Sequence, residues 1–179
     1  ETVPKPFPEN RRDRYLSEFE IRKFWINANT GSISEPMSIF LRLLLATAQR
    51  KGELLNAQKS HVNMGEGVWE IPPEYSKNGK PHRVPLSQPA LNLFSRGMEL
   101  SDSEYVFPSS SGLKPLSSAS PNRAIGRNFL VWGLDTSFCP HDLRRTAATH
   151  MRRLGVPRYD VARVLNHSQY DVTGHYDLY

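Results

Sequence analysis

The sequence predicts a mostly α-helical chain with one small antiparallel β-sheet, folded as a single domain. Three observations lead to this α+β class. Several segments repeat apolar residues at helical spacing, and one segment, residues 67–87, changes to a pattern typical of strands. The chain also has 179 residues, of which 38% are hydrophobic, so it is long enough for one domain with a real core.

The first half of the chain begins with three segments of helical character. Residues 16–29 contain Ser17 and Glu20 at the spacing of a capping box, which marks a helix start. Residues 36–48 are apolar on nearly every side, which indicates a buried helix. Residues 49–58 follow as a basic and then helical stretch.

The strand-like segment predicts a β-hairpin. Residues 68–71 and 83–86 are the two expected strands, and residues 77–80 read Lys-Asn-Gly-Lys between them. Asn-Gly between strand-like runs is a strong signal for a hairpin turn. A short helix with a glycine near its end is expected next, over residues 88–98.

The second half predicts three more helices after a loop rich in serine and proline. Pro121 suits the first position of a helix that Ser120 would cap. Residues 140–156 carry an apolar stripe, and Gly155 is expected to end that helix. Residues 157–167 form another short helical pattern.

Composition narrows the class of partner and of environment. The net charge is +5 and the isoelectric point about 9.5, which favours an anionic partner, nucleic acid first. Cys139 is the one cysteine, so no disulfide framework can form and a reducing cytoplasm is the default expectation. No apolar run approaches transmembrane length, and no membrane partner is expected.

Six polar residues form a chemically consistent set. They are Arg50, Lys77, His141, Arg144, His167 and Tyr176. Taken singly, each has an ordinary structural alternative, such as a solvated turn lysine or a helix-capping histidine. Taken together they suit phosphoryl transfer, because arginine binds non-bridging oxygens bidentately, lysine and histidine move protons, and tyrosine can be a covalent nucleophile. This chemistry calls for no metal and no cofactor, since the arginines supply the electrostatic stabilisation.

Four blocks of the sequence together resemble the catalytic domain of the tyrosine recombinases, the phage integrase family. "TAQRKGELL" resembles the T-G-x-R-x-x-E-[LI] block and "SKNGKPHRVPLS" the hairpin block. "PHDLRRTAATHM" resembles the H-x-x-R block, and "LNHSQYDVTGHY" the block L-G-H-S followed by tyrosine. The wording is similar to that of integrases of prophages and genomic islands. Two departures are assigned to Gln49 and Asn166, each taken to stand where glycine is usual.

The resemblance implies a fold, a domain division and a reaction. Residues 15–179 would be the catalytic domain, and residues 1–14, rich in proline, a linker from a missing N-terminal DNA-binding part. The reaction would be site-specific recombination, integrating or excising a mobile element. Tyr176 would attack a DNA phosphate to give a 3′-phosphotyrosyl bond and a free 5′-hydroxyl.

The resemblance also implies a role for the other residues. Arg50 and Arg144 would hold the non-bridging oxygens, and Lys77 would protonate the leaving oxygen, with Lys80 as the nearby alternative. His141 would move the tyrosine proton, His167 would support the phosphate, and Glu53 would orient basic side chains.

The partners implied are double-stranded DNA attachment sites. The isolated domain would be a monomer that forms a tetramer on DNA, with accessory DNA-bending or directionality factors, at the nucleoid in a bacterial cytoplasm.

Three other functions remain open at this stage. A type IB topoisomerase-like enzyme would use similar residues to relax DNA as a monomer. A DNA-binding module without activity is disfavoured, because no catalytic position is lost. A metal-dependent hydrolase would use the histidines His141, His150, His167 and His175, but the sequence has no H-E-x-x-H motif or close acidic cluster.

Overall fold

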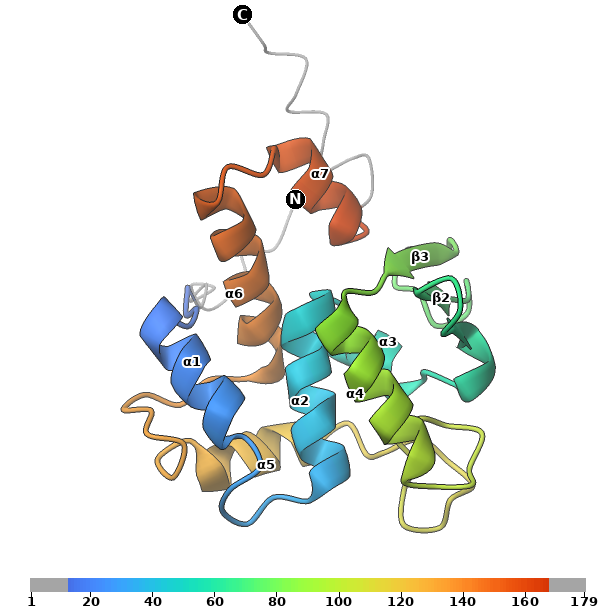
Figure 1. The fold of residues 1–179 in the computed structure, drawn as a ribbon, viewed down its shortest axis with the longest axis horizontal. Helices are drawn as coiled ribbons and strands as arrows, with labels where there is room; N and C mark the ends of the chain where they lie inside the picture. The colour runs from blue at the N-terminus through green and yellow to red at the C-terminus, as the bar shows by residue number, and fades with distance from the viewer. Residues whose placement is uncertain (1–12, 168–179) are drawn as a thin grey trace, which may run out of the picture.

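The computed structural model describes residues 13–167, and within them the chain is mostly helical with one small sheet (Figure 1). The helices are α1 (Glu18–Asn27), α2 (Glu35–Thr47), α3 (Lys51–Leu55), a 3₁₀ turn (Lys59–His61), α4 (Gln88–Glu99), α5 (Ser120–Asn128), α6 (Pro140–Arg153) and α7 (Arg158–Val164). The strands are β1 (Val62–Asn63), β2 (Val68–Ile71) and β3 (His82–Pro85). The predicted α+β class is confirmed.

Local signals in the sequence set several helix ends. Ser17 caps α1, accepting a hydrogen bond from the Glu20 amide while the Glu20 carboxylate accepts one from the Ser17 amide, which is the predicted capping box. Helix α6 ends as predicted at Gly155, whose φ of 84° permits the left-handed turn. There the amide of Val156 donates back to the Met151 carbonyl, closing a Schellman motif.

The start of α5 differs by one residue from its prediction. The N-cap is Ala119, and Ser120 is the first helical residue, followed by Pro121. The Ser120 hydroxyl makes no capping bond and instead accepts from the guanidinium of Arg123. A serine and a proline side by side mark a helix start, but they do not fix its position to a single residue.

The sheet has the strand order β1-β2-β3, with both pairs antiparallel. The β2–β3 hairpin is confirmed, with Val68 opposite Pro85 and Ile71 opposite His82. The connection is longer than a tight Asn-Gly turn, because two prolines at positions 72 and 73 follow β2 and cannot extend the ladder. Strand β1 is an addition to the prediction; two residues are too short to produce an alternating pattern.

The core is built around α2, which contacts α4, α6 and α5 (Figure 1). The sheet lies to one side of the helices and joins them through Trp69, whose ring lies 5.5 Å from that of Phe94 on α4. Among residues 13–167 no helix has the length and apolarity needed to cross a membrane.

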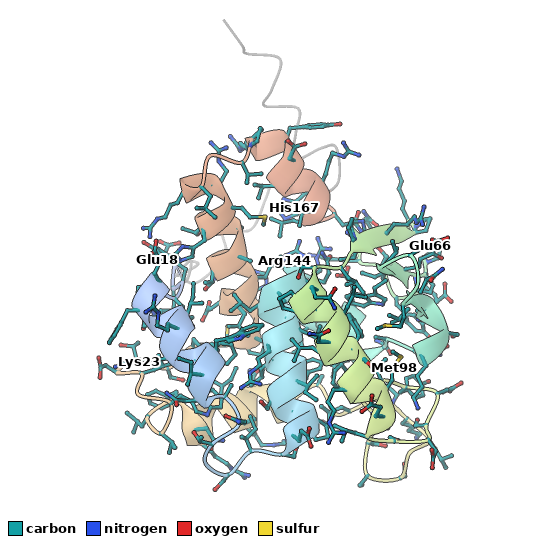
Figure 2. The ribbon with its side chains drawn as sticks, in the orientation of Figure 1. Glu18, Lys23, Glu66, Met98, Arg144 and His167 are labelled. Atoms are coloured by element: carbon teal, nitrogen blue, oxygen red, sulfur yellow. The ribbon has the colours of Figure 1, made fainter. Side chains whose placement is uncertain are left out.

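Helix α7 is held by a smaller cluster of its own. Val161 and Leu165 are buried against Ala48, at the end of α2, and against partly buried residues of α6. The last turn of α7 therefore lies beside the ends of two other helices. This placement brings His167, just beyond α7, close to residues that are far away in the sequence (Figure 2).

Candidate active site

Side chains from three other segments gather around the last carbonyls of α7. Arg144 on α6 donates through Nη2 to the Leu165 carbonyl, and Arg50 donates through Nη2 to the Asn166 carbonyl at 3.4 Å. The carbonyl of Val164 accepts from the side-chain amide of Gln49 at 2.8 Å. The last carbonyls of a helix lack partners within the helix and carry partial negative charge, so cationic side chains are favoured there. The C-terminal end of α7 thus brings two arginines together.

Arg50 is the residue immediately before α3, and Glu53 fixes it there. One carboxylate oxygen of Glu53 accepts from the Arg50 amide at 2.9 Å, and the other accepts from Nη1 at 3.0 Å. The Glu53 side chain is 1% exposed and the Arg50 side chain 22%. One carboxylate therefore caps the helix and orients the guanidinium.

Arg144 is buried and is held mainly by backbone oxygens. It is 4% exposed, and besides Leu165 it donates through Nη1 to the Ala48 carbonyl at 2.8 Å. Burial and then the positive charge of Arg50 lower the pKa of Arg144 to about 10, which still leaves it protonated at neutral pH. A second cation nearby has this effect only at short range, so the two arginines form one concentrated positive site.

His141 is in the first turn of α6 and faces a pocket beside Arg144. The pocket has a volume of about 240 Å³, and its lining is Gln49, Lys51, Asn122, Cys139, Pro140, His141 and Arg144. Partial desolvation, and then the charges of Arg145 and Arg144, lower the pKa of His141 below its usual value. The N-terminal end of α6 carries partial positive charge, so this pocket has the electrostatics of an anion site.

The remaining predicted residues lie at different distances from this centre. His167 lies three residues beyond the last residue of α7, is exposed, and lines a pocket together with Thr47 and His82; Figure 2 labels it together with Arg144. Lys77 is exposed on the loop between β2 and β3 and has no hydrogen bond or ion pair within residues 13–167. Tyr176 lies outside the described residues, as does Tyr179.

Two residues with a left-handed backbone flank the arginines. Ala48 has φ 57° and Asn166 has φ 48°, and they are the only non-glycine residues with positive φ between positions 13 and 167. The carbonyl of the first accepts from Arg144 and that of the second from Arg50. The left-handed conformation favours glycine, so both are positions where a glycine would be natural.

The assignment of Gln49 to the usual glycine position is wrong by one residue. Ala48, two residues before Arg50, has the left-handed backbone, and the spacing of the T-G-x-R block also leads to it. Gln49 is instead a buried residue, 1% exposed, whose amide nitrogen donates to the carbonyls of Thr47 and Val164, each at 2.8 Å. It connects the end of α2 to α7. The assignment of Asn166 agrees with its left-handed backbone.

His82 is a residue near the site that the sequence analysis did not single out. Its Nε2 lies 3.3 Å from the Val164 carbonyl, which Gln49 also binds. Burial lowers the pKa of His82, and the charges of Arg144 and Arg50 lower it further. No local pattern marks this strand residue, because its proximity arises from the packing of β3 against α7.

The histidines proposed for a metal site do not come together in the described part of the chain. Across positions 13–167 there is no group of three or more His, Cys, Asp or Glu residues that could hold a metal ion. His150 instead bonds through Nε2 to the Leu16 carbonyl at 2.9 Å and lies edge-on to Tyr15, so it joins α6 to the segment just before α1. His175 lies outside the described residues.

Comparisons with known proteins agree with this fold. Residues 14–177 match the model of the phage integrase family. The chain is 28% identical to tyrosine recombinase XerC of Alcanivorax borkumensis over 83% of its length and 50% of the relative's. It is 30% identical to prophage integrase IntA of Escherichia coli over 77% of its length and 33% of the relative's. The chain thus spans half or less of these two relatives.

Solved structures show the same fold. The crystal structure of XerA recombinase matches with a TM-score of 0.74 and 24% identity, covering 98% of this chain and 62% of that one. The catalytic core of lambda integrase matches with a TM-score of 0.68 and 22% identity, covering 86% of this chain and 91% of that one. Because the family match extends over nearly the whole chain, this protein belongs to the phage integrase family.

Proposed function

We propose that this chain is the catalytic part of a site-specific DNA recombinase, which cuts and rejoins strands through a 3′-phosphotyrosyl intermediate. Relatives of this family carry the names tyrosine recombinase and prophage integrase. The observation that carries the proposal is the convergence of Arg50 and Arg144 on the adjacent carbonyls of Leu165 and Asn166, just beyond α7 and directly before His167 in the chain. Two guanidinium groups at one point are suited to the non-bridging oxygens of a single phosphate.

The chemistry assigns one task to each residue. The hydroxyl oxygen of Tyr176 attacks the scissile phosphorus, and the bond from phosphorus to the 5′-oxygen breaks. His141 accepts the tyrosine proton, for which its lowered pKa is suitable because the ring is then neutral at pH 7. Lys77 gives a proton to the leaving 5′-oxygen. The arginines and His167 stabilise the charge on the phosphate, and Glu53 holds Arg50 in place.

Strand exchange completes the reaction without an external energy source. The 5′-hydroxyl of another strand gives its proton to Lys77 as its oxygen attacks the phosphotyrosyl phosphorus, and the bond from phosphorus to Tyr176 breaks as His141 returns its proton to the tyrosine. The substrate is double-stranded DNA carrying attachment sites. A tetramer on DNA is the proposed active assembly; one structural neighbour is a lambda integrase tetramer bound to a Holliday junction. Accessory DNA-bending factors, residues 1–14 as a linker, and action at the bacterial nucleoid are part of the same proposal.

The test uses a nicked duplex whose core sequence is randomised, so that the attachment site need not be known in advance. Cleavage near the nick releases a short fragment and traps the covalent adduct, which a denaturing gel separates from free DNA. The wild-type chain is expected to form the adduct in the presence of EDTA, and Tyr176→Phe is expected to bind DNA but form none. Tyr179→Phe and Tyr170→Phe are the matched controls and should retain the adduct.

Other outcomes point to the alternatives. An adduct that survives in Tyr176→Phe but disappears in Tyr179→Phe would reassign the nucleophile. Relaxation of supercoiled plasmid without strand exchange between two captured sites would favour the topoisomerase-like activity. Cleavage that EDTA abolishes would favour a metal-dependent hydrolase.

A further inference from the structure

A closed ring of three side-chain hydrogen bonds connects the Lys77 loop to the end of α7. The Ser76 hydroxyl donates to the Asn78 side-chain oxygen at 2.8 Å, and the side-chain amide of Asn78 donates to the Asn166 side-chain oxygen at 2.8 Å. The Asn166 amide completes the ring by donating to the Ser76 hydroxyl at 3.1 Å. Each of the three side chains donates once and accepts once within the ring.

In the sequence, Lys77 lies between two members of the ring. Ser76 and Asn78 are its two neighbours, so the backbone on both sides of the lysine is held while its side chain remains exposed. The Asn78 oxygen also accepts from the Lys80 amide at 3.1 Å, and the Gly79 amide donates to the Ser76 carbonyl at 3.0 Å. These bonds shape the whole turn around the same two residues.

Asn166 connects this turn directly to the two groups beside it. Its carbonyl accepts from Arg50, and the next residue is His167. Its φ of 48° is a conformation that glycine adopts readily and asparagine tolerates, but only asparagine also supplies an amide to the loop. The side chain at this position therefore does something that glycine could not do.

We propose that Asn166 is a positioning residue that docks the Lys77 loop against the arginine site, so that the lysine is held near the scissile phosphate before DNA binds. This inference rests on the proposed function, because it gives Lys77 the role of acid. A small displacement of a general acid slows the reaction, because proton transfer needs the donor within hydrogen-bond distance of the leaving oxygen. A ring that fixes both neighbours of Lys77 limits such displacement.

The first experiment measures the loop itself and needs no DNA. Asn166→Gly keeps the left-handed backbone and deletes the side-chain amide, while Asn78→Ala removes the same contact from the loop side together with the acceptor of the Lys80 amide. Both variants should raise the hydrogen-exchange rate of the Gly79 amide by about tenfold, the size expected for losing one or two net hydrogen bonds, and Asn166→Gly should also raise that of the Lys80 amide. Unchanged exchange in both variants would overturn the docking.

Asn63→Ala is the matched control for the loop measurement. Asn63 accepts from the Glu66 amide at 3.0 Å in the β1–β2 turn, so this variant removes an asparagine hydrogen bond from the other turn of the same sheet. Exchange at Gly79 and Lys80 should stay at the wild-type rate. Faster exchange there in Asn63→Ala would mean that the sheet loosens as a whole, which would also overturn a specific role for Asn166.

The second experiment measures cleavage of a duplex that the wild-type chain captures from the randomised pool. One version has a normal 5′-oxygen at the scissile bond, and the other a 5′-bridging sulfur, which leaves without needing a proton. Lys77→Ala should slow the first by about a hundredfold or more, as expected for loss of a general acid, and the second far less. Asn166→Gly should slow the first by roughly tenfold, with the same rescue by sulfur.

A double variant separates positioning from a general structural effect. If Asn166 acts through Lys77, then Lys77→Ala with Asn166→Gly should be no slower than Lys77→Ala alone. Equal slowing of Asn166→Gly on both versions of the duplex, or additive losses in the double variant, would overturn the proposal, because the amide would then act through Arg50 or through the fold.

Failure of the proposed function would look different. If the wild-type chain captures no DNA, the recombinase proposal fails, and loop exchange alone then decides whether Asn166 docks the loop. If Lys80→Ala, and not Lys77→Ala, shows the selective rescue by sulfur, the acid is Lys80. The proposal as stated for Lys77 is then overturned, even if the loop is docked.

Discussion

The guanidinium of Arg144 donates to the carbonyl of Ala48 at 2.8 Å, and Ala48 is one of two non-glycine residues in positions 13–167 with a left-handed backbone. The other is Asn166, whose carbonyl accepts from Arg50. Each arginine of the site is thus placed by the backbone of a residue at a position suited to glycine. The two hydrogen bonds that Arg144 donates here go to carbonyl oxygens, which do not neutralise its charge and so preserve its attraction for a phosphate, whereas Arg50 also pairs with the Glu53 carboxylate.

The first prediction concerns the guanidinium of Arg144, which donates through both Nη1 and Nη2. Arg144→Lys keeps one positive charge but cannot reach the carbonyls of Ala48 and Leu165 together while facing the substrate. Covalent adduct formation should become slower by about 2–4 kcal/mol in activation free energy, as for loss of a preorganised donor. DNA affinity, measured by fluorescence anisotropy, should fall much less, because many other phosphate contacts remain.

Arg152→Lys is the control for this change, since Arg152 is on the same helix and also donates to a backbone carbonyl, that of Val156, but is exposed. Its adduct rate should match the wild type. Equal losses of binding and cleavage in Arg144→Lys would mean that Arg144 only docks the DNA backbone.

The left-handed backbone of Ala48 leads to a prediction on stability. Ala48→Val adds a β-branched side chain at φ 57° in a site 3% exposed, between Val161 and Leu165. The free energy of unfolding in urea should fall by about 2–4 kcal/mol, from backbone strain and overpacking together. Ala46→Val, at an exposed position of the preceding helix, should cost only about 0.5 kcal/mol. Similar losses in the two variants would contradict strain at Ala48.

Sequence signals predicted well what depends on neighbouring residues. The capping box of Ser17 and Glu20 and the helix end at Gly155 are local, so a few residues carry all the information needed. The hairpin was predictable from its two strands, but β1 was not, because pairing with β2 and not its own pattern makes it a strand. Ser120 was placed one residue wrong for the same reason: the exact helix start depends on the preceding turn.

The contacts within the site could not be predicted from local sequence patterns. The four sequence blocks pointed to Arg50 and Arg144, but not to the α7 carbonyls that hold them, since every backbone has carbonyls and only packing selects which are used. The contacts of His82 with Val164 and of Asn78 with Asn166 could not be predicted either, because each joins segments far apart in the sequence.

Glu53 provides a third prediction, through comparison with a second pair at the same spacing. Glu53 and Arg50 form a pair in which the carboxylate is 1% exposed, whereas Glu99 and Arg96 form one in which it is 59% exposed. Glu53→Gln should lower the free energy of unfolding by about 1–3 kcal/mol, because a buried charge-assisted bond is lost. Glu99→Gln should change it by less than about 0.5 kcal/mol. Urea unfolding of both variants is the measurement, and equal effects would show that burial does not strengthen the Glu53 pair.

The lowered pKa values of the histidines predict how stability depends on pH. Burial lowers the pKa of His82, and partial desolvation with nearby arginines lowers that of His141, both from 6.5. Below pH 6.5 the unfolded chain therefore binds more protons than the folded chain, so the free energy of unfolding falls as the solution is acidified through that value. Urea unfolding at several pH values between about 7.5 and 5 should show this decline, because most carboxylates remain ionised in both states there.

Variants assign the decline to its source. His82→Gln and His141→Gln should each make the slope shallower, since each removes one group that takes up a proton on unfolding. Glu20 titrates in a different pH range from the histidines. Its hydrogen bonds with Arg14 lower its pKa from 4.5 to about 2, so the stability it contributes is lost only as the pH falls from about 4.5 to about 2. Glu20→Gln should therefore leave the slope above pH 5 unchanged and flatten the one below about pH 4.5. A slope above pH 5 that disappears in Glu20→Gln but persists in both histidine variants would contradict this assignment.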